Sequence, residues 1–241
     1  MLTLLFMLFG VAIGSFLNVL ILRIPKEENI AFPASHCLTC QSTLKWYHNI
    51  PLFSWLFLRG KCAFCKQPIS MQYPLVELST AIIFGICAQE PALKDAILFS
   101  LIFSLLLALS IIDLRYKAVP DSLSLPALLL VVFTGDILLS MQDALLYAGG
   151  FALLRIVISF AMKKEAMGEA DIIIAAIIGA SLGTPLGLIA IYLSAIISLP
   201  AFLIVAKKGF ELPFIPFLTL GLWITYLFDE TFLFLIGQLY G

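Results

Sequence analysis

Long apolar runs separated by short polar turns make up most of the chain. The first run, 2–22, is long enough to cross a bilayer, whose hydrocarbon core takes about 20 helical residues. The later runs are 73–88, 96–112, 122–140, 144–162, 171–206 and 213–228. The pattern predicts a membrane protein built of helices.

The run 171–206 is too long for one crossing. A helix of its length would extend about 54 Å at 1.5 Å per residue, and the bilayer core is about 30 Å thick. Gly183-Thr184-Pro185 is the expected turn, because glycine and proline interrupt helices. With this division we expect about eight transmembrane helices.

The polar region 26–72 divides the chain into three parts. We expect a first transmembrane helix at 1–25, a polar loop at 26–72 and a helical membrane domain at 73–241 that carries the chemistry. Hydrophobic residues make up 62% of the chain and charged residues 12%, against about 25% charged in soluble proteins. The fold class is therefore all-α and polytopic, in contact with membrane lipid. The net charge of −1 gives no sign of nucleic-acid binding.

The basic residues predict the orientation. If the polar loop is cytoplasmic, twelve of the fourteen Lys and Arg residues fall on that side, including Lys163, Lys164, Lys207 and Lys208. Lys94 and Arg155 are the exceptions. This orientation places Asp113, Asp121 and Asp171 at the cytoplasmic face. The turns on the far side then hold Glu90, Asp95, Asp136, Asp143, Asp229 and Glu230.

The polar loop holds two Cys-x-x-Cys pairs, Cys37 with Cys40 and Cys62 with Cys65. Two such pairs can close a tetrahedral site around Zn²⁺, and a site with four thiolates is structural rather than catalytic. Reduced free thiols are the alternative, because the cytoplasm disfavours disulfides. A histidine, His36 or His48, could replace one cysteine as ligand. The fifth cysteine, Cys87, lies in an apolar run and is expected to be a buried hydrophobe.

Two aspartates stand at the ends of apolar runs. Asp113 closes 96–112 and Asp171 opens 171–206, so both reach one membrane boundary if both runs cross. Two close carboxylates can hydrolyse an amide, one ionised to deprotonate water and one protonated to polarise the carbonyl. A helix dipole favours ionised Asp171 as the base and Asp113 as the acid, although the pair titrates as a unit.

Each acid also has a structural interpretation. Asp171 could be an ordinary helix N-cap, and Asp113 could be solvated beside Arg115. Asp121 follows Pro120 before a run, so we expect it to cap a helix.

Two charged residues lie inside apolar runs. Glu77 lies one turn inside its run, where an ionisable group is costly and is usually functional or paired. It could contact substrate or cofactor, or pair with Arg23 or Arg155. Arg155 is expected to face the bundle interior as an ion-pair partner.

A series of short motifs follows in order along the chain. The motifs are Gly14-Ser15-Phe16-Leu17-Asn18, Trp46-x-x-Asn49-Ile50-Pro51, Gly60-Lys61-Cys62-x-x-Cys65 and Tyr73-Pro74-Leu75-Val76-Glu77. Over nearly its whole length the chain resembles the type IV prepilin peptidases, also called prepilin leader peptidase/N-methyltransferases. The resemblance implies a bacterial inner-membrane aspartic protease of the type IV pilus or type II secretion systems. It would remove the basic leader of prepilins or pseudopilins at the cytoplasmic face, after a glycine. Many members of the family then methylate the new N-terminus with S-adenosylmethionine.

The family's acidic motifs look like Asp113…Pro120-Asp121 and Gly168-Glu169-Ala170-Asp171 here. The resemblance implies Asp113 and Asp171 as the catalytic pair, with Asp121, Gly168 and Glu77 in supporting roles. The chain departs from the family pattern at Leu38, Ala170, Ile173 and Ile215; Ala170 replaces a glycine, and Ile215 stands where a Phe-Gly-Pro motif has its glycine.

Two other classes of function are open. A small transporter could relay protons through its charges, although transport sites usually lie near mid-membrane. A membrane scaffold could use the cysteine loop to dock a pilus or secretion ATPase. Cleavage of a purified prepilin would separate the peptidase from both.

Overall fold

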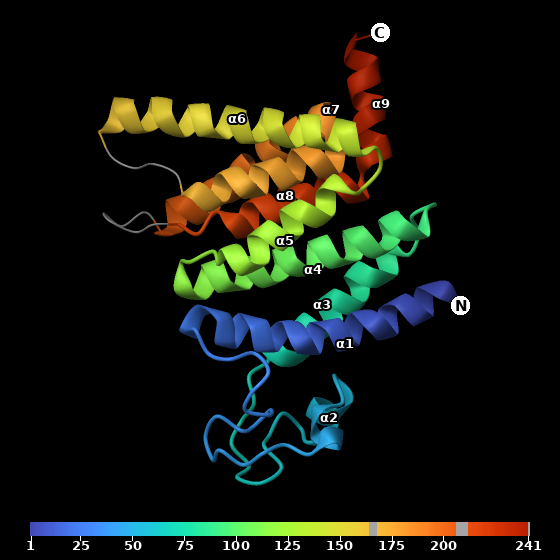
Figure 1. The fold of residues 1–241 in the computed structure, drawn as a ribbon, viewed down its shortest axis with the longest axis vertical. Helices are drawn as coiled ribbons and strands as arrows, with labels where there is room; N and C mark the ends of the chain where they lie inside the picture. The colour runs from blue at the N-terminus through green and yellow to red at the C-terminus, as the bar shows by residue number, and fades with distance from the viewer. Residues whose placement is uncertain (164–167, 206–211, 241) are drawn as a thin grey trace. The chain divides into compact units, whose positions relative to one another are not determined.

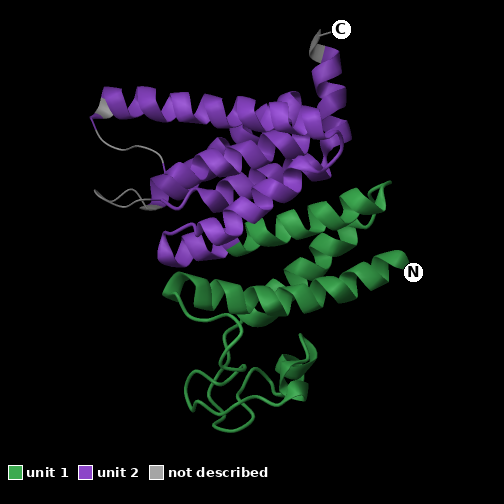
Figure 2. Ribbon diagram, in the orientation of Figure 1, with its two compact units in different colours: residues 1–108 green, residues 109–241 purple. Residues whose placement is uncertain are grey.

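The computed structural model describes residues 1–163, 168–205 and 212–240, and this part of the chain is helical without a strand (Figure 1). It contains two compact units, residues 1–108 and 109–241 (Figure 2). Helix α4, Leu93–Tyr116, runs through the boundary between them. The three-part division that the sequence suggests stays a prediction.

Unit 1 contains a pair of apolar helices joined by the polar loop. Two long helices, α1 (Leu2–Arg23) and α3 (Gln72–Cys87), pack side by side (Figure 1). Between them lie three short elements: η1 (Ile24–Lys26), η2 (Trp46–Asn49) and α2 (Phe53–Phe57). The first part of α4 completes the unit.

Small residues let α1 and α3 approach closely. Gly10 and Gly14 lie one turn apart on α1, and a Cβ at Gly14 would stand 2.7 Å from the Cα of Glu77 and closer still to Thr80 Oγ1. Asn18, one turn further on, is buried, and its amide donates to the carbonyls of Gly14 and Tyr73, both at 3.2 Å. Small and polar residues of α1 thus form a helix–helix contact.

Unit 2 is arranged around α7. This helix, Glu169–Val205, contacts α5 (Asp121–Val132), α6 (Ile137–Met162) and α8 (Ile215–Leu227). Helix α9, Asp229–Tyr240, follows α8 after a bend of 77°. The C-terminal part of α4 belongs to the same unit.

The turn expected near Gly183 is present as a kink in α7. Gly183 has φ 72° and ψ 175°, a conformation that only glycine adopts easily. Two side chains of α6 fasten the kink: Thr184 Oγ1 donates to Asp143 Oδ1 at 2.7 Å, and Tyr147 Oη donates to the Thr184 carbonyl at 2.6 Å. Asp143 is therefore buried within α6, and its expected place in a turn is wrong.

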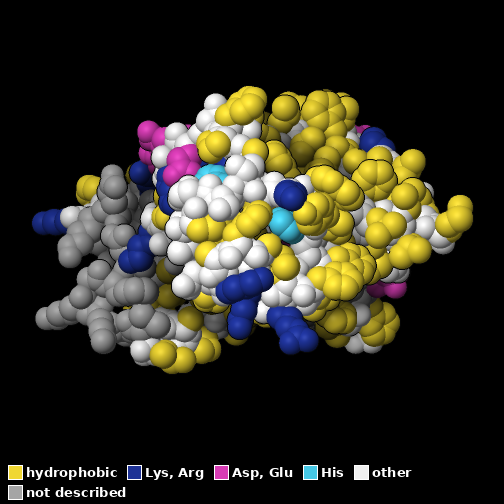
Figure 3. All heavy atoms as spheres, turned by 90° about the horizontal axis from the view of Figure 1, so that it is seen from below, with side chains coloured by type: hydrophobic (Ala, Val, Ile, Leu, Met, Phe, Trp, Pro, Cys, Tyr) yellow, Lys and Arg dark blue, Asp and Glu magenta, His cyan; other side chains and the backbone are white. Residues whose placement is uncertain are grey.

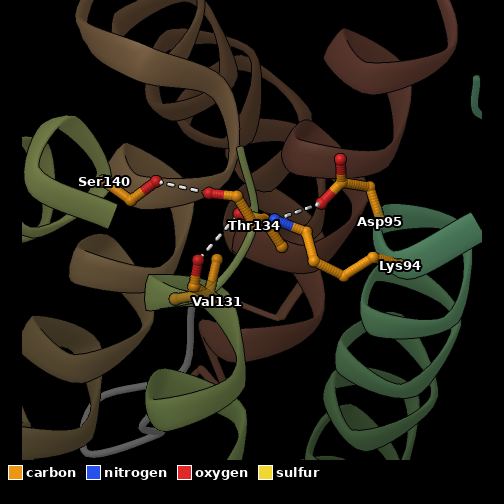
Figure 4. A network of polar contacts seen from close by, with 5 residues as sticks. All are labelled: Lys94, Asp95, Val131, Thr134 and Ser140. Carbon is orange, nitrogen blue, oxygen red and sulfur yellow. Dashed lines mark hydrogen bonds and ion pairs between the residues drawn. The ribbon is translucent and has the colours of Figure 1, made fainter. Parts of the chain in front are cut away.

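The turn between α5 and α6 also differs from the expected one. The apolar run 122–140 is broken after Val132, and α6 starts at Ile137 because the Asp136 carboxylate accepts from the amides of Leu138 and Leu139. Thr134 Oγ1 donates to the Val131 carbonyl at 2.7 Å, and Ser140 Oγ donates to the Thr134 carbonyl at 2.9 Å (Figure 4). The apolar pattern missed the turn between α5 and α6 because its side chains are mostly small or apolar.

In unit 1, the neighbouring residues Lys94 and Asp95 form an ion pair of 3.6 Å at the start of α4 (Figure 4).

Among the described residues, four helices are long and apolar enough to cross a membrane, or five if α8 and α9 form one bent span. The shorter α3 and α5 are apolar too, and Gly183 divides α7. The all-α membrane fold, with the cysteine loop between α1 and α3, is confirmed; the eight crossings stay a prediction. Lys164, Lys207 and Lys208, which support the expected orientation, lie outside the described residues.

The close contact at Gly14 gives a stability prediction. Gly14→Ala should destabilise the protein by about 1–3 kcal/mol, because the added methyl group meets the backbone of Glu77 as well as the Thr80 hydroxyl, and the backbone cannot turn away as a side chain can. Gly149→Ala is the control, since a Cβ at Gly149 meets nothing within 4 Å, and it should be neutral or slightly stabilising. The measurement is the unfolding midpoint of each purified variant in the same detergent. Equal midpoints for the two variants would contradict the packing argument.

Candidate active site and metal centre

Asp113 lies near the end of α4 and is buried, with 7% of its surface exposed. Its Oδ2 accepts a hydrogen bond of 3.2 Å from the backbone N–H of Ile215, the first residue of α8. The N-terminus of α8 thus offers an anion the favourable end of a helix dipole. The alternative in which Asp113 is a solvated residue beside Arg115 is wrong.

Asp171 is the third residue of α7 and is partly buried. Its Oδ2 accepts a hydrogen bond of 3.1 Å from the backbone N–H of Gly168, the residue before the helix. This is the reach-back half of a capping box, in which the side chain of the third helical residue satisfies the N-cap amide. Asp171 therefore stabilises the start of α7 without being the N-cap itself.

The structure brings these two acids together. Both belong to unit 2, and they are close enough for the charge of Asp113 to act on Asp171. Each faces the amide groups at a helix N-terminus, of α8 for Asp113 and of α7 for Asp171. Two carboxylates so placed repel each other when both are ionised.

Asp121 has a different environment. It is exposed as the first residue of α5, and the N-cap position belongs to Pro120, which forms no side-chain cap. The expected capping role of Asp121 is therefore wrong. The reason is local: Pro120 takes the extended conformation that precedes a helix, so α5 starts one residue earlier than expected.

Glu77 ties the polar loop to α3. It is buried, and its Oε2 accepts a hydrogen bond of 2.7 Å from the backbone N–H of Leu52. The two arginines weighed as its partners bind elsewhere: Arg23 donates to loop carbonyls, and Arg155 pairs with Glu169 at 3.2 Å. The Glu169 side chain is 82% exposed, so we expect this ion pair to contribute little stability.

The four loop cysteines form one cluster. Their Sγ atoms all lie within 4.8 Å of one another, and those of Cys37 and Cys65 are 3.8 Å apart. A tetrahedron with Zn–S bonds of about 2.3 Å has S···S edges of about 3.8 Å, so the cluster fits a tetrahedral metal ion. Cys87 is buried in α3, as expected.

Two matching turns build this cluster. In each turn the residue after the second cysteine has positive φ, 58° at Gln41 and 62° at Lys66, and donates its N–H to the carbonyl of the first cysteine. Each first cysteine also donates its own N–H back across the turn, Cys37 to Ser42 at 3.1 Å and Cys62 to Gln67 at 2.8 Å. The same hydrogen bonds in both turns orient the four thiol groups toward one another.

The thiols influence one another's ionisation. Hydrogen bonds with Ser42 lower the pKa of Cys40 to about 6, which favours the thiolate that metals bind. At Cys65 a backbone hydrogen bond from Gln67 acts in the same direction, but burial and the other cysteines outweigh it and raise the pKa to about 11. Four thiolates thus need a cation between them.

Neither histidine belongs to the cysteine cluster within the described chain. His36 Nδ1 lies 3.1 Å from the Ala34 carbonyl, and the His48 ring packs edge-on against Tyr47 and Phe64.

Sequence reasoning missed two backbone donors, Leu52 to Glu77 and Ile215 to Asp113. Pro216 directly after Ile215 could have indicated the second, because proline in the first turn is typical of a helix start. Ile215 stands where the family motif has a glycine, but the donor to Asp113 is the backbone amide, so isoleucine supplies it as well as glycine would.

These features define the class of protein: a multi-pass helical membrane protein with a pair of interacting acids and a four-cysteine loop. Residues 8–90 match the bacterial peptidase A24 N-terminal domain, and residues 100–205 match the type IV leader peptidase family. The chain belongs to this family of leader peptidases.

Named relatives support the assignment. The chain is 35% identical over 239 residues to the type 4 prepilin-like proteins leader peptide-processing enzyme of Escherichia coli O78:H11, covering 88% of both proteins. It is 34% identical to the prepilin leader peptidase/N-methyltransferase of Neisseria gonorrhoeae, covering 92% of this chain and 89% of the relative. The identity to the enzyme of the same name from Myxococcus xanthus is 39%, over 72% of this chain and 54% of that protein. No solved structure matches the chain.

The cysteine cluster gives a prediction about metal content. Purified protein should carry about one metal ion per chain, the number that one four-thiolate site binds. Cys62→Ser should lose most of the metal, whereas Cys87→Ser should keep it, because Cys87 lies in α3 outside the cluster. Elemental analysis of the three proteins measures this. Equal metal content in both variants would place the metal elsewhere.

Proposed function

We propose that Asp113 and Asp171 are the catalytic pair of this leader peptidase. The observation that carries the proposal is the meeting of two acids from α4 and α7 within unit 2, each held by a backbone amide at a helix start. The family assignment supports aspartic peptidase chemistry, and these two acids lie at the positions of the family motifs.

In the proposed reaction one proton is shared between the two carboxyl groups. The ionised carboxylate takes a proton from water, and the resulting hydroxide bonds to the carbonyl carbon of the scissile peptide. The protonated partner gives its proton to the carbonyl oxygen. When the tetrahedral intermediate collapses, the C–N bond breaks, the leaving amine takes the proton held by the former base, and one hydroxyl group of the intermediate returns its proton to the partner carboxylate, so the pair again holds one proton.

The roles of base and acid are not fixed to one aspartate each but are shared by the pair. The sequence favours Asp171 as the base because it stands at a helix start, but Ile215 at the start of α8 gives Asp113 the same advantage. The starts of α7 and α8 therefore each favour an anion at the acid they face, and proton exchange within the pair lets either act as the base.

The substrate we propose is the leader junction of prepilin-like or pseudopilin-like proteins. The names of the relatives support this class, and so does the apolar surface of the helices, beside which the apolar N-terminal helix of such a substrate could lie. Cleavage would occur at the cytoplasmic face of the bacterial inner membrane, where the basic residues orient the loop and the acids. The two alternative functions, a proton-relaying transporter and a membrane scaffold that docks an ATPase, do not explain why two acids lie near each other in unit 2.

A second activity, methylation of the new N-terminus, is supported by the N-methyltransferase part of the relatives' names. The methyl group would pass from the sulfonium of S-adenosylmethionine to the amine, which loses a proton. No glycine-rich loop in the described residues indicates where this cofactor binds.

For the cysteine site we propose zinc with a structural role. Four thiolates fill the coordination sphere and leave no position for water, as in closed structural zinc sites. The metal would hold the two cysteine turns together and take no part in peptide hydrolysis.

Removing either acid of the pair should stop cleavage. Asp113→Asn and Asp171→Asn should each reduce leader removal by at least about 10²-fold, the lower range for a lost acid–base group. Asparagine can still accept the hydrogen bond from Ile215 or Gly168, so the fold should be kept. The measurement is cleavage of a purified prepilin-like substrate at matched enzyme concentration.

Asp121→Asn is the matched control for these variants, because Asp121 is an exposed acid at another helix start. It should weaken cleavage slightly at most. Full cleavage by Asp113→Asn with none by Asp121→Asn would move the pair to Asp121 and Asp171. Adding S-adenosylmethionine to the same assay tests methylation by the gain of one methyl mass on the mature product.

Chelation separates a structural metal from a catalytic one. Brief treatment with a mild chelator should leave cleavage unchanged, because the proposed chemistry uses only the two acids and water. Cysteine labelling and metal analysis report how much metal remains in the treated enzyme. Immediate loss of cleavage, with the helical fold intact, would show that the metal acts in the reaction.

A further inference from the structure

An apolar surface stands out on the polar loop of unit 1. Trp46 of η2 is 79% exposed, and Phe53, Leu56 and Phe57 of α2 are 60%, 64% and 84% exposed. We call these four residues the apolar loop surface. Figure 3 shows hydrophobic side chains over much of the face seen from below, with Lys and Arg side chains among them. Large aromatic groups left so open in a folded segment indicate a surface that is covered in use.

The other side of α2 is already occupied. Ser54 Oγ donates to the Tyr47 carbonyl at 2.7 Å, and the Trp55 indole packs against Gly60. Phe53, Leu56 and Phe57 follow one another at the spacing of one helical face. The face of α2 that carries Ser54 and Trp55 thus makes contacts within the loop, and the face that carries Phe53, Leu56 and Phe57 is left exposed.

The hydrogen bond to Glu77 fixes the depth of this surface. Leu52, the residue directly before α2, donates to Glu77 at 2.7 Å. Glu77 lies five residues beyond Gln72, the first residue of the apolar helix α3, which is about 7.5 Å along the helix axis. Interfacial helices bury their apolar face about 5–10 Å into the boundary between headgroups and acyl chains. With the bilayer boundary taken at the start of α3, the hydrogen bond to Glu77 anchors the start of α2 within this range.

A second set of contacts ties the start of the loop to α1. Arg23, the last residue of α1, donates to the carbonyls of Asn29 at 2.9 Å and Pro33 at 2.8 Å. Because the loop is tied to α1 near its start and to α3 through Leu52 in its middle, it stays beside these apolar helices.

The basic residues of the loop also indicate that it lies against a lipid surface. Between 45 and 66 the loop carries Lys45, Arg59, Lys61 and Lys66 and no acidic residue. All four are exposed. Basic residues beside exposed aromatic groups are the combination that binds a surface of anionic phospholipids.

We propose that the apolar loop surface inserts into the lipid leaflet on its side of the membrane, with the four basic residues at the anionic headgroups and Glu77 holding the insertion depth. The occupant is the bilayer itself. A second copy of the chain or a protein partner on the same surface would be a different interaction, and the experiment below separates these cases.

The test uses the fluorescence of Trp46 in the full chain, reconstituted in vesicles of phosphatidylcholine and phosphatidylglycerol. The chain has three tryptophans, so Trp223→Phe leaves Trp46 and Trp55, and the double variant Trp46→Phe/Trp223→Phe leaves Trp55 alone. The difference between the two proteins is the signal of Trp46. Lipids brominated on their acyl chains should quench this signal strongly, and acrylamide in the water should quench it weakly.

Two outcomes would overturn the proposal. Quenching of Trp46 by acrylamide but not by brominated lipid would place the surface in water. Protection from both quenchers would mean that protein covers it, a second copy if the protection disappears when each vesicle holds one chain.

Variants of Glu77 test the depth. Glu77→Gln keeps an acceptor for the Leu52 amide and should leave the quenching of Trp46 unchanged, whereas Glu77→Leu removes the acceptor and should shift Trp46 toward acrylamide. Metal content of the four-cysteine cluster shows that the loop is still folded in each variant. Unchanged quenching in a folded Glu77→Leu protein would overturn the anchoring role of Glu77.

Discussion

A carboxylate buried at a helix end needs a hydrogen-bond donor, and the structure of the site depends on how Asp113 obtains one. At the end of α4 the carbonyl groups and the helix dipole both oppose a negative charge. The backbone amide of Ile215, at the start of α8, supplies the missing donor at 3.2 Å. Because α8 also packs on α7, the contact that satisfies Asp113 belongs to the same packing that positions Asp171.

The same constraint explains the other polar groups of the apolar helices. Asn18 bonds to carbonyls of α1 and α3, Glu77 accepts from Leu52, and Asp143 accepts from Thr184 at the kink of α7. An unpaired polar group in an apolar environment costs several kcal/mol, so each one selects the neighbour that can satisfy it. The polar residues in these helices thereby determine which elements pack against one another.

The polar loop with its cysteine cluster follows a different principle. Its apolar side chains are largely exposed, so it lacks the core that usually stabilises a segment of this size. Backbone hydrogen bonds form the two cysteine turns, and the cluster they create brings four thiols together, which repel one another once they are ionised to thiolates. Metal binding would convert that repulsion into folding energy, as in other small metal-dependent domains.

Local patterns in the sequence were enough to predict much of this protein. Apolar runs located most of the long helices within a few residues but missed the turn between α5 and α6. Glycine and proline located the kink at Gly183, and cysteine spacing predicted the cluster. The sequence failed where a residue's role depends on a distant partner: Asp143 looked like a turn residue, and Asp113 could have been a solvated residue beside Arg115. Only the tertiary structure places Ile215 against Asp113 and Leu52 against Glu77. The physical reason is that hydrophobicity and chain flexibility are properties of neighbouring residues, whereas satisfying a buried charge requires a donor from another part of the chain.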